Sequence, residues 1–158
     1  MDRPAIPAVT LRPLLPAEFA GYRASFIRDW AADLVRVEDL SPADAVREAT
    51  RRTDASLPQG FTTLDHHLYA ILSGTDRVGT LWFSVADGHA FLDDITIDEA
   101  ARGQGHGRRA LVQLEALARA LGLVRIDLHV YRDNPRAIAL YEQLGYRTTG
   151  LKMRKSLS

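Results

Sequence analysis

The segment "ARGQGHGRRA" at residues 101–110 decides the fold, because it joins a strand pattern to a helix pattern through a run of glycines. The apolar stretch "FLDDITI" (91–97) precedes it, and a helical repeat of apolar residues follows it. Glycine lets backbone N–H groups approach a ligand closely, and the start of the next helix adds free N–H groups of its own. Gly103, Gly105 and Gly107 therefore predict an anion-binding loop.

Arginines surround these glycines and narrow the choice of anion. Arg102, Arg108 and Arg109 favour a phosphate or pyrophosphate over a lone carboxylate. A P-loop is excluded, because it needs Lys followed by Ser or Thr after its last glycine. A dinucleotide fingerprint needs glycine where Arg108 stands and usually opens a parallel sheet, so it is the weaker alternative. A tight turn that binds nothing is the purely structural alternative, although such a turn needs only one or two glycines.

Hydrophobic periodicity predicts ten elements along the chain. They are a strand at 9–14, helices at 17–37 and after Ser41, strands at 66–74, 77–85 and 89–97, a helix ending at Gly122, a strand at 123–130, a helix from Pro135 to Gly145 and an extended segment at 146–155. Turn signals between the three middle strands are typical of an antiparallel meander, whereas the strand after the crossover helix is expected to be parallel to its neighbour. The predicted fold class is α/β, a mixed, mostly antiparallel central sheet flanked by helices in the order β-α-α-β-β-β-α-β-α-β, in a single domain over residues 1–158.

Composition places the chain among ordinary soluble domains, with 46% hydrophobic and 25% charged residues in a length of 158. It has no apolar stretch of about 18 residues and no basic region followed by an apolar run at its start, so we expect a cytoplasmic protein without a membrane partner. The absence of cysteine excludes a cysteine nucleophile and a thiolate metal site, and no metal is expected. The 18 arginines against 2 lysines are typical of a GC-rich bacterial genome.

Charge is divided unevenly along the chain, although the formal net charge is zero and argues against a nucleic-acid partner. Residues 1–100 carry 9 basic and 16 acidic side chains, a net charge of −7, and residues 101–158 carry 11 and 4, a net charge of +7. A chance distribution of solvated charges explains this as well as function does. The functional interpretation is a phosphate-bearing ligand on the second half and a cationic partner at the first.

Two motifs together resemble those of a known family. Arg102-Gly103-Gln104-Gly105-His106-Gly107 is similar to the acetyl-CoA-binding signature of the GNAT superfamily of N-acetyltransferases, and "NPRAIALYEQLGY" (134–146) is similar to a second region of that superfamily. The resemblance covers about residues 91–146. It implies the GNAT fold and an enzyme that uses acetyl-CoA as co-substrate to acetylate an amine acceptor.

The resemblance also implies which residues bind acetyl-CoA. The backbone of the 102–107 loop and the following helix start would hold the pyrophosphate, with Arg102, Arg108 or Arg109 supplying charge. The backbone at 95–97 would pair with the pantetheine arm as an added strand does. Asn134 would contact the pantetheine region, although an N-cap before Pro135 is an equally good role for it. The expected cofactor residues are Ile95, Thr96, Ile97, Arg102, Gly103, Gln104, Gly105, His106, Gly107, Arg108 and Asn134.

Tyr141 is implied as the general acid that protonates the departing CoA thiolate, and a core aromatic at helical spacing is its alternative. The base is expected at Asp93 or Asp94. The segment resembles strands of polyamine-type family members that carry Glu at the position of Asp93, and the shorter Asp favours a relayed water. Strand alternation sends the two aspartates to opposite faces, so at most one is expected to reach the ligand. His66, His67, His129 or solvent are the alternatives.

The acceptor is the least defined partner. The acidic first hundred residues predict a small cationic amine, while a peptide N-terminus or a protein lysine stays open. Without cysteine, the acetyl group is expected to pass directly from acetyl-CoA to the amine. A non-catalytic acyl-CoA-binding regulatory module is the competing function. The aromatic stripe Phe19, Tyr22, Phe26 and Trp30 is interpreted chiefly as core, and the protein is expected to be a monomer or a homodimer.

Overall fold

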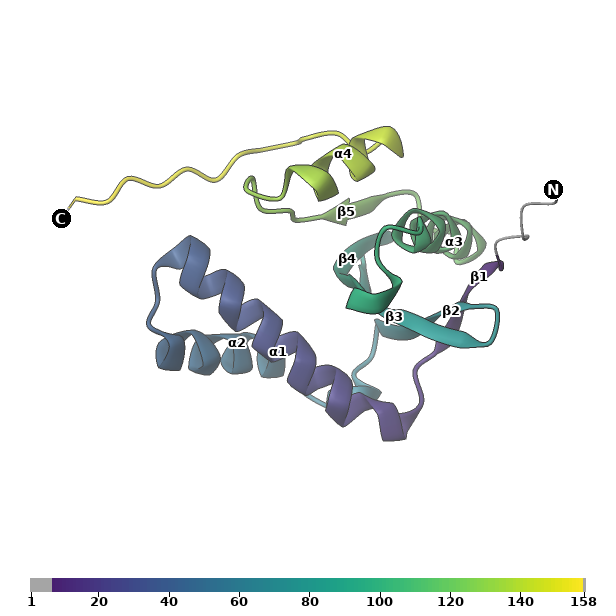
Figure 1. Ribbon diagram of the computed structural model, residues 1–158, viewed down its shortest axis with the longest axis horizontal. Helices are drawn as coiled ribbons and strands as arrows, with labels where there is room; N and C mark the ends of the chain where they lie inside the picture. The colour runs from purple at the N-terminus through teal and green to yellow at the C-terminus, as the bar shows by residue number, and fades with distance from the viewer. Residues whose placement is uncertain (1–6, 158) are drawn as a thin grey trace. The chain divides into compact units, whose positions relative to one another are not determined.

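The computed structural model describes residues 7–157 and divides into two compact units, one up to Asp127 and the other from Leu128 (Figure 1). The elements are β1 (Val9–Pro13), α1 (Pro16–Glu38), α2 (Pro42–Ser56), β2 (His66–Ser73), β3 (Asp76–Ala86), β4 (His89–Ile97), α3 (His106–Ala120), β5 (Ile126–Leu128) and α4 (Pro135–Gln143). Two short 3-10 turns lie at Gly60–Thr62 and Glu99–Ala101. This order agrees with the predicted order as far as α4. Among the described residues, no helix is long and apolar enough to cross a membrane.

The sheet has the strand order β1-β2-β3-β4-β5, and its first four strands form the antiparallel meander that the turn signals predict. Beside β4, the N–H of Val124 donates to the carbonyl of Gly88, and the N–H of Ala90 donates to the carbonyl of Arg125. Both contacts advance in the same direction along the two segments, as in the parallel pair that a crossover helix requires.

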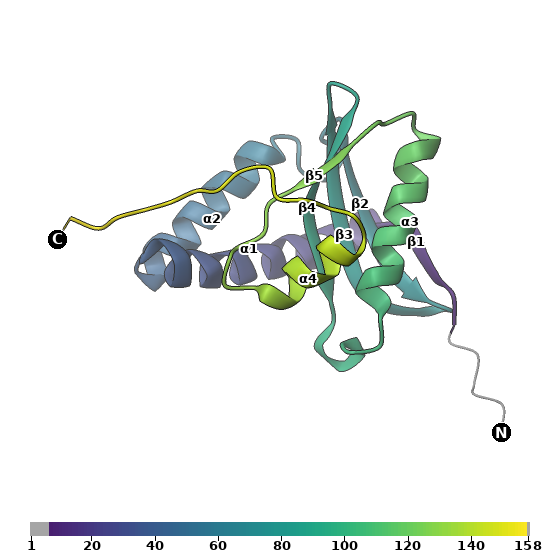
Figure 2. The ribbon, with the colours of Figure 1, turned by 90° about the horizontal axis from the view of Figure 1, so that it is seen from above.

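Helices cover both faces of the sheet within the first unit, with α1 and α2 on one side and α3 on the other (Figure 2). On the α1 side, the buried cluster comprises Leu14, Tyr22, Leu57, Leu68, Ala70 and Trp82. A second cluster joins α1 to α2 and comprises Ile27, Ala31, Leu34, Ala45 and Ala49. On the other side, α3 contacts β1 and β4 and buries Ala110, Leu111, Leu114 and Ala118 at helical spacing.

Local chemistry sets where the first two helices begin. The hydroxyl of Ser41 accepts a hydrogen bond from the N–H of Asp44, as expected for an N-cap, and Pro42 occupies the first position of α2. At the start of α1, Glu18 accepts from the N–H of Leu15 and from the guanidinium of Arg12, at 2.8 and 2.9 Å. The bonds from Arg12 and then Leu15 lower the pKa of Glu18 to about 2, so α1 is held against β1 by an ionised carboxylate.

Close approach of two strands explains why residue 79 is a glycine. Gly79 of β3 lies opposite Ile97 of β4, and a Cβ at this position would collide with the backbone carbonyl of Thr96. The two strands can therefore pair closely here only because residue 79 has no side chain.

Two predicted strands differ in the structure. β5 spans Ile126–Leu128 rather than 123–130, because the N–H of Leu123 still bonds to Ala118 at the end of α3 and the Val124 side chain is 81% exposed. The predicted final strand at 146–155 is not formed. Its apolar side chains Leu151 and Met153 are 74% and 88% exposed, so no burial offsets the entropy lost on ordering a strand.

The described part of the second unit contains one helix. The side-chain oxygen of Asn134 accepts from the N–H of Ala137 at 3.1 Å, which caps α4, and Pro135 follows at the first helical position. The helix ends before Gly145, whose φ of 92° is left-handed, as the sequence predicts for a glycine at this place.

Candidate functional site

The glycine loop presents a row of free N–H groups. Gly103 and Gly105 have left-handed φ values of 75° and 77°, and α3 begins directly afterwards at His106. Within the described residues, none of the five consecutive N–H groups from Gly103 to Gly107 donates a hydrogen bond. Because these groups adjoin the positive end of the α3 dipole, they form a cradle for an anion.

Arginine side chains brace this loop. The guanidinium of Arg109 donates to the carbonyls of Gln104, Gly105 and Pro7, the last two at 3.2 and 3.3 Å. Arg102 donates to the carbonyl of Ile97 at 3.0 Å, which ties the loop to the end of β4. These two arginines therefore satisfy carbonyl groups of the loop and its neighbours and leave the N–H groups for a ligand.

His106 is buried to 5% exposure on the face of α3 that packs against the sheet. Its Nδ1 has no hydrogen-bond partner among the described residues. Since the ring is buried in the core, only the backbone N–H of His106 is placed for an anion in the loop.

β4 leads from this loop to the second part of the site. Ile95, Thr96 and Ile97 pair with Leu81, Thr80 and Gly79 of β3. One edge of this segment is thus used by the sheet, and a pantetheine arm paired with these residues would use the other edge.

A β-bulge lies two residues earlier in β4 and corrects the prediction that Asp93 and Asp94 face opposite ways. Leu92 lies opposite Phe83 and Asp94 opposite Trp82, so Asp93 is an extra residue in the strand. Asp94 accepts a hydrogen bond from Tyr22 of α1, and Asp93 interacts with Ser84, which shares a face with Trp82. Simple alternation fails at the bulge, so both carboxylates lie on the face that α1 covers.

The two carboxylates have different surroundings. Both oxygens of Asp94 accept hydrogen bonds, Oδ2 from the hydroxyl of Tyr22 and Oδ1 from the hydroxyl of Thr96, each at 3.1 Å. Burial raises the pKa of Asp94 to about 6, while these two bonds lower it. By contrast, Oδ2 of Asp93 is buried without a hydrogen-bond partner among the described residues.

Burial is also the main cause that raises the pKa of Asp93 to about 7. The interaction with Ser84 lowers that pKa, and the neighbouring charge of Asp94 raises it further. A carboxylate with a pKa near neutrality and a free oxygen is suited to take a proton from a substrate.

Aromatic rings adjoin these carboxylates. Phe26 contacts Trp82 edge to face at 5.1 Å and Trp30 at 5.5 Å, and Tyr22 stacks on Phe26 at 6.1 Å. Further along α1, the charges of Asp29 and Asp33 reach Asp94 and raise its pKa. Carboxylates beside aromatic faces attract cations.

The three histidines that were alternatives for the base have contacts of their own. Nδ1 of His66 accepts from the indole N–H of Trp82 at 3.0 Å, and burial lowers the pKa of His66. His67 stacks on Phe83 at 4.8 Å, on the opposite face of β2 from His66. His129 belongs to the second unit, where its ring contacts Tyr131.

Tyr141 and Asn134 also belong to the second unit. Asn134 has the N-cap geometry described above, and the Tyr141 ring contacts Tyr146 edge to face at 5.6 Å. Their predicted roles toward acetyl-CoA stay predictions.

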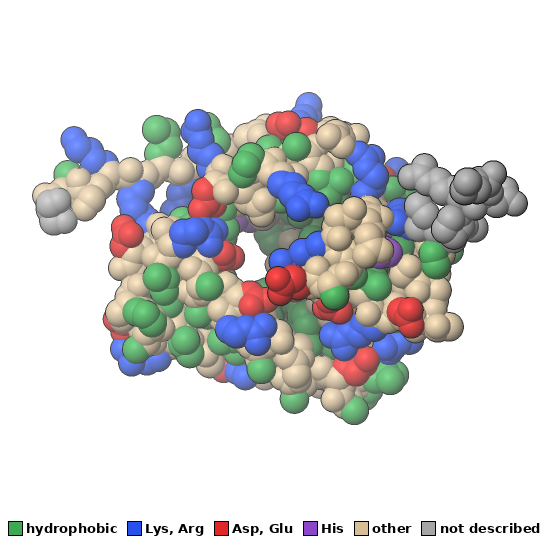
Figure 3. All heavy atoms as spheres, viewed as in Figure 1, with side chains coloured by type: hydrophobic (Ala, Val, Ile, Leu, Met, Phe, Trp, Pro, Cys, Tyr) green, Lys and Arg blue, Asp and Glu red, His purple; other side chains and the backbone are tan. Residues whose placement is uncertain are grey.

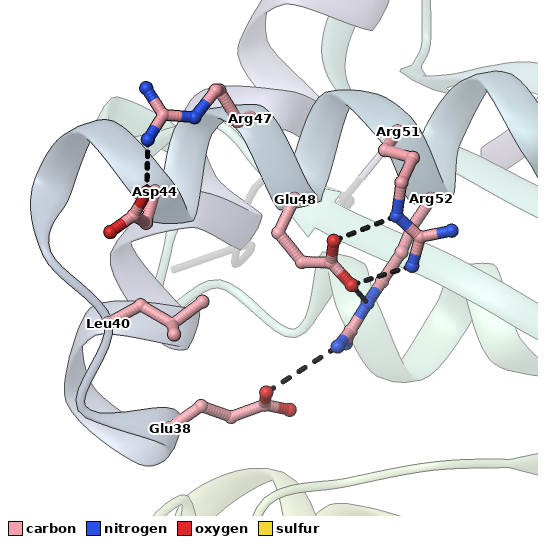
Figure 4. Close-up of a pocket in the computed structure, with 7 residues that line it drawn as sticks. All are labelled: Glu38, Leu40, Asp44, Arg47, Glu48, Arg51 and Arg52. Carbon is pink, nitrogen blue, oxygen red and sulfur yellow. Dashed lines mark hydrogen bonds and ion pairs between the residues drawn. The ribbon is translucent and has the colours of Figure 1, made fainter.

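A separate depression of about 360 Å³ lies where the end of α1 meets α2 (Figure 4). Three carboxylates, three guanidinium groups and the side chain of Leu40 line it. Arg51 and Arg52 both donate to Glu48, at 2.7 and 2.6 Å, and Arg47 pairs with Asp44. Acidic and basic side chains are likewise interspersed over the α1 and α2 surface in Figure 3. The acidic side chains that line this depression are therefore paired with arginines of the same two helices.

Sequence reasoning missed Tyr22, Thr96 and Ser84 as partners of the aspartates. Tyr22 lies 72 residues from Asp94 in the sequence, and an aromatic at helical spacing is typical of a core position. The signal in the sequence was the pair of adjacent aspartates within an apolar strand, because bulges that redirect side chains are common beside active sites.

Comparison with known proteins shows the family of this chain. The chain matches the acetyltransferase (GNAT) family over residues 26–146. It is 33% identical over 154 residues to the uncharacterized N-acetyltransferase YycN of Bacillus subtilis, covering 94% of this chain and 99% of that protein. The crystal structure of the B. subtilis putative acetyltransferase YycN has a TM-score of 0.91 at 31% identity, covering 96% of this chain and 99% of the other.

A more distant structure shares the fold alone. The spermidine N-acetyltransferase of Vibrio cholerae, solved with CoA and spermine, has a TM-score of 0.66 at 18% identity and covers 90% of this chain and 82% of the other. The extent of the family match and the identity to YycN over nearly the whole chain show that this protein belongs to the GNAT family of acetyltransferases.

Proposed function

We propose that this acyltransferase moves an acetyl group from acetyl-CoA directly to the primary amine of a small cationic acceptor. The observation that carries the proposal is that one strand joins two features. β4 connects the carboxylate pair at the bulge to the row of free N–H groups at Gly103–Gly107.

The loop supports acetyl-CoA as the donor. Five free N–H groups at a helix start suit the two negative charges of a pyrophosphate, and the exposed Arg108 adds positive charge beside them. Gly105 has a left-handed φ of 77°, a backbone conformation that residues with a side chain rarely adopt. The shape of the cradle therefore favours glycine at this point.

The bulge supports a cationic amine as the acceptor. An ammonium group must lose a proton before its nitrogen can attack the thioester carbonyl. Asp93 and Asp94 attract the cation, and one of them accepts the proton. The nitrogen then forms a bond to the acetyl carbon, the carbon–sulfur bond breaks, and the CoA thiolate receives a proton from Tyr141, the acid that the family resemblance implies.

Calorimetric titration with acetyl-CoA tests the cofactor part. We expect binding in the micromolar range and its loss in Gly105→Glu, which places bulk and negative charge in the cradle. Gly88→Glu is the matched control, because Gly88 also has a left-handed φ, of 74°, and a Cβ there meets open space. Absence of binding by folded wild-type protein contradicts the proposal.

An amine panel tests the acceptor part, with release of the CoA thiol as the signal. We expect cationic diamines to exceed neutral amines and peptides, because Asp93 and Asp94 attract positive charge to this face of the sheet. Tight acetyl-CoA binding without transfer to any amine would instead favour a non-catalytic acyl-CoA-binding module.

A further inference from the structure

We propose that the two aspartates of the bulge have different roles. Asp93 removes the proton from the acceptor amine, and Asp94, fixed by Tyr22 and Thr96, is a positioning residue. This inference rests on the proposed acetyl transfer and assigns the roles within that site.

Hydrogen-bond capacity distinguishes the two carboxylates. Each oxygen of Asp94 already accepts a hydrogen bond from a hydroxyl group, one from Tyr22 on α1 and the other from Thr96 on β4. Asp93 keeps the buried Oδ2 without a partner among the described residues, so this oxygen has lone pairs left to accept a proton that a water relays from the ammonium group. The arrangement makes Asp93 the acceptor and Asp94 the fixed neighbour.

Charge explains why the fixed neighbour matters. Two adjacent carboxylates on one face cannot both ionise as easily as isolated ones. Asp94 therefore holds the pKa of Asp93 up, in addition to the larger effect of burial. Asp29 and Asp33 on α1 face Asp94 with like charge, Tyr22 and Thr96 donate to it, and Ser84 on β3 faces Asp93. Besides burial, groups on α1, β3 and β4 thus set the pKa values of the pair.

Tyr22 links the helix to the pair. Its side chain is 6% exposed, within the cluster that includes Trp82, and its hydroxyl reaches Asp94 of β4. Removing this hydroxyl leaves the ring packing in place but frees one oxygen of Asp94. Tyr22 is thus a second positioning residue, acting through Asp94.

The test compares Asp93→Asn, Asp94→Asn and Tyr22→Phe, with Tyr69→Phe as control. Tyr69 is a partly buried tyrosine that stacks on Phe83, on the other face of the sheet. Two readouts are measured on each full-length protein. The first is kcat/KM against pH for acetyl transfer, and the second is ¹³C NMR titration of the aspartate carboxyls in the free protein.

Asp93→Asn is expected to lower kcat by about 100-fold or more, the usual scale for loss of a general base. Asp94→Asn is expected to keep turnover within about tenfold of wild type and to move the acid limb of the pH profile to lower pH, by about one pH unit. The NMR midpoint of Asp93 is expected to move down with it. In Tyr22→Phe the midpoint of Asp94 is expected to rise, and in Tyr69→Phe neither midpoint moves.

The opposite pattern overturns the inference. If Asp94→Asn abolishes turnover while Asp93→Asn keeps it, Asp94 is the base. If Asp94→Asn leaves the NMR midpoint of Asp93 unchanged, the two carboxylates are not coupled. A wild-type protein that binds acetyl-CoA but acetylates no amine overturns the proposed function and the assignment of a base with it, whereas the NMR titration still reports whether the coupling exists.

Discussion

Replacement of Asp93 by Asn is expected to make the protein more stable at neutral and alkaline pH, because a buried, ionised carboxylate lowers the free energy of unfolding. Burial raises the pKa of Asp93 from its ordinary value of 3.8 to about 7. The folded chain therefore binds this proton more tightly than the unfolded chain, and the contribution of Asp93 to stability falls as pH rises from about 4 to about 7. At about 1.4 kcal/mol per pH unit, the full difference is about 4 kcal/mol.

Asparagine has a similar shape and no charge, so the variant does not lose stability in this way as the pH rises. Urea unfolding of both proteins between about pH 4.5 and about pH 8.5 measures the difference in the free energy of unfolding. At the acid end we expect a small difference between the two proteins. Above pH 7 we expect the free energy of unfolding of the variant to be higher by about 2 to 4 kcal/mol. The lower figure allows for water that reaches a partly exposed group. A difference that stays constant with pH would refute the reasoning, because it would mean that Asp93 ionises as easily in the folded chain as in the unfolded one.

Two further predictions concern the backbone around the site. Gly79→Ala is expected to lower the free energy of unfolding by about 2 to 3 kcal/mol, because the new Cβ collides with the carbonyl of Thr96. Gly21→Ala, in the second turn of α1 with open space around its Cβ position, is expected to raise the free energy of unfolding by about 0.5 to 1 kcal/mol. If urea unfolding shows that both substitutions stabilise or both destabilise, the explanation of Gly79 by close approach of the strands is wrong. Arg109→Ala is expected to weaken acetyl-CoA binding by about tenfold, because three carbonyls lose their hydrogen bonds to Arg109 and the loop is no longer held in one conformation. Arg119→Ala, at an exposed pair with Glu115 on the same helix, is the control in the same titration and is expected to bind as wild type does.

Elements whose signal is local could be predicted from the sequence. Ser41 and Pro42 indicate the start of α2, and the glycines from Gly103 indicate the loop, because caps and left-handed positions depend on the residue itself. The meander followed in the same way from its turn signals. The last extended segment was wrong as a strand, because a strand also needs a partner and a buried face, which polarity alternation in one segment does not report.

The carboxylate pair shows the limit more sharply. Alternation assumes a regular pleat, and the extra residue at Asp93 breaks it without changing the composition of the strand. The partner of Asp94 is Tyr22, which a sequence pattern assigns to the core because its ring is indeed buried there. Its hydroxyl becomes visible as a functional group only when α1 and β4 are placed in space.

The bulge also bears on how such a site arises in evolution. Asp93 is one residue more than β4 needs, since Leu92 and Asp94 keep neighbouring partners on either side of it. Insertion or deletion of a single codon can therefore add or remove a carboxylate while the loop at Gly103 and the rest of the sheet keep their register. A deletion variant that lacks Asp93 and retains its circular dichroism spectrum would reproduce that one step in reverse, from a strand with the extra carboxylate to a strand without it.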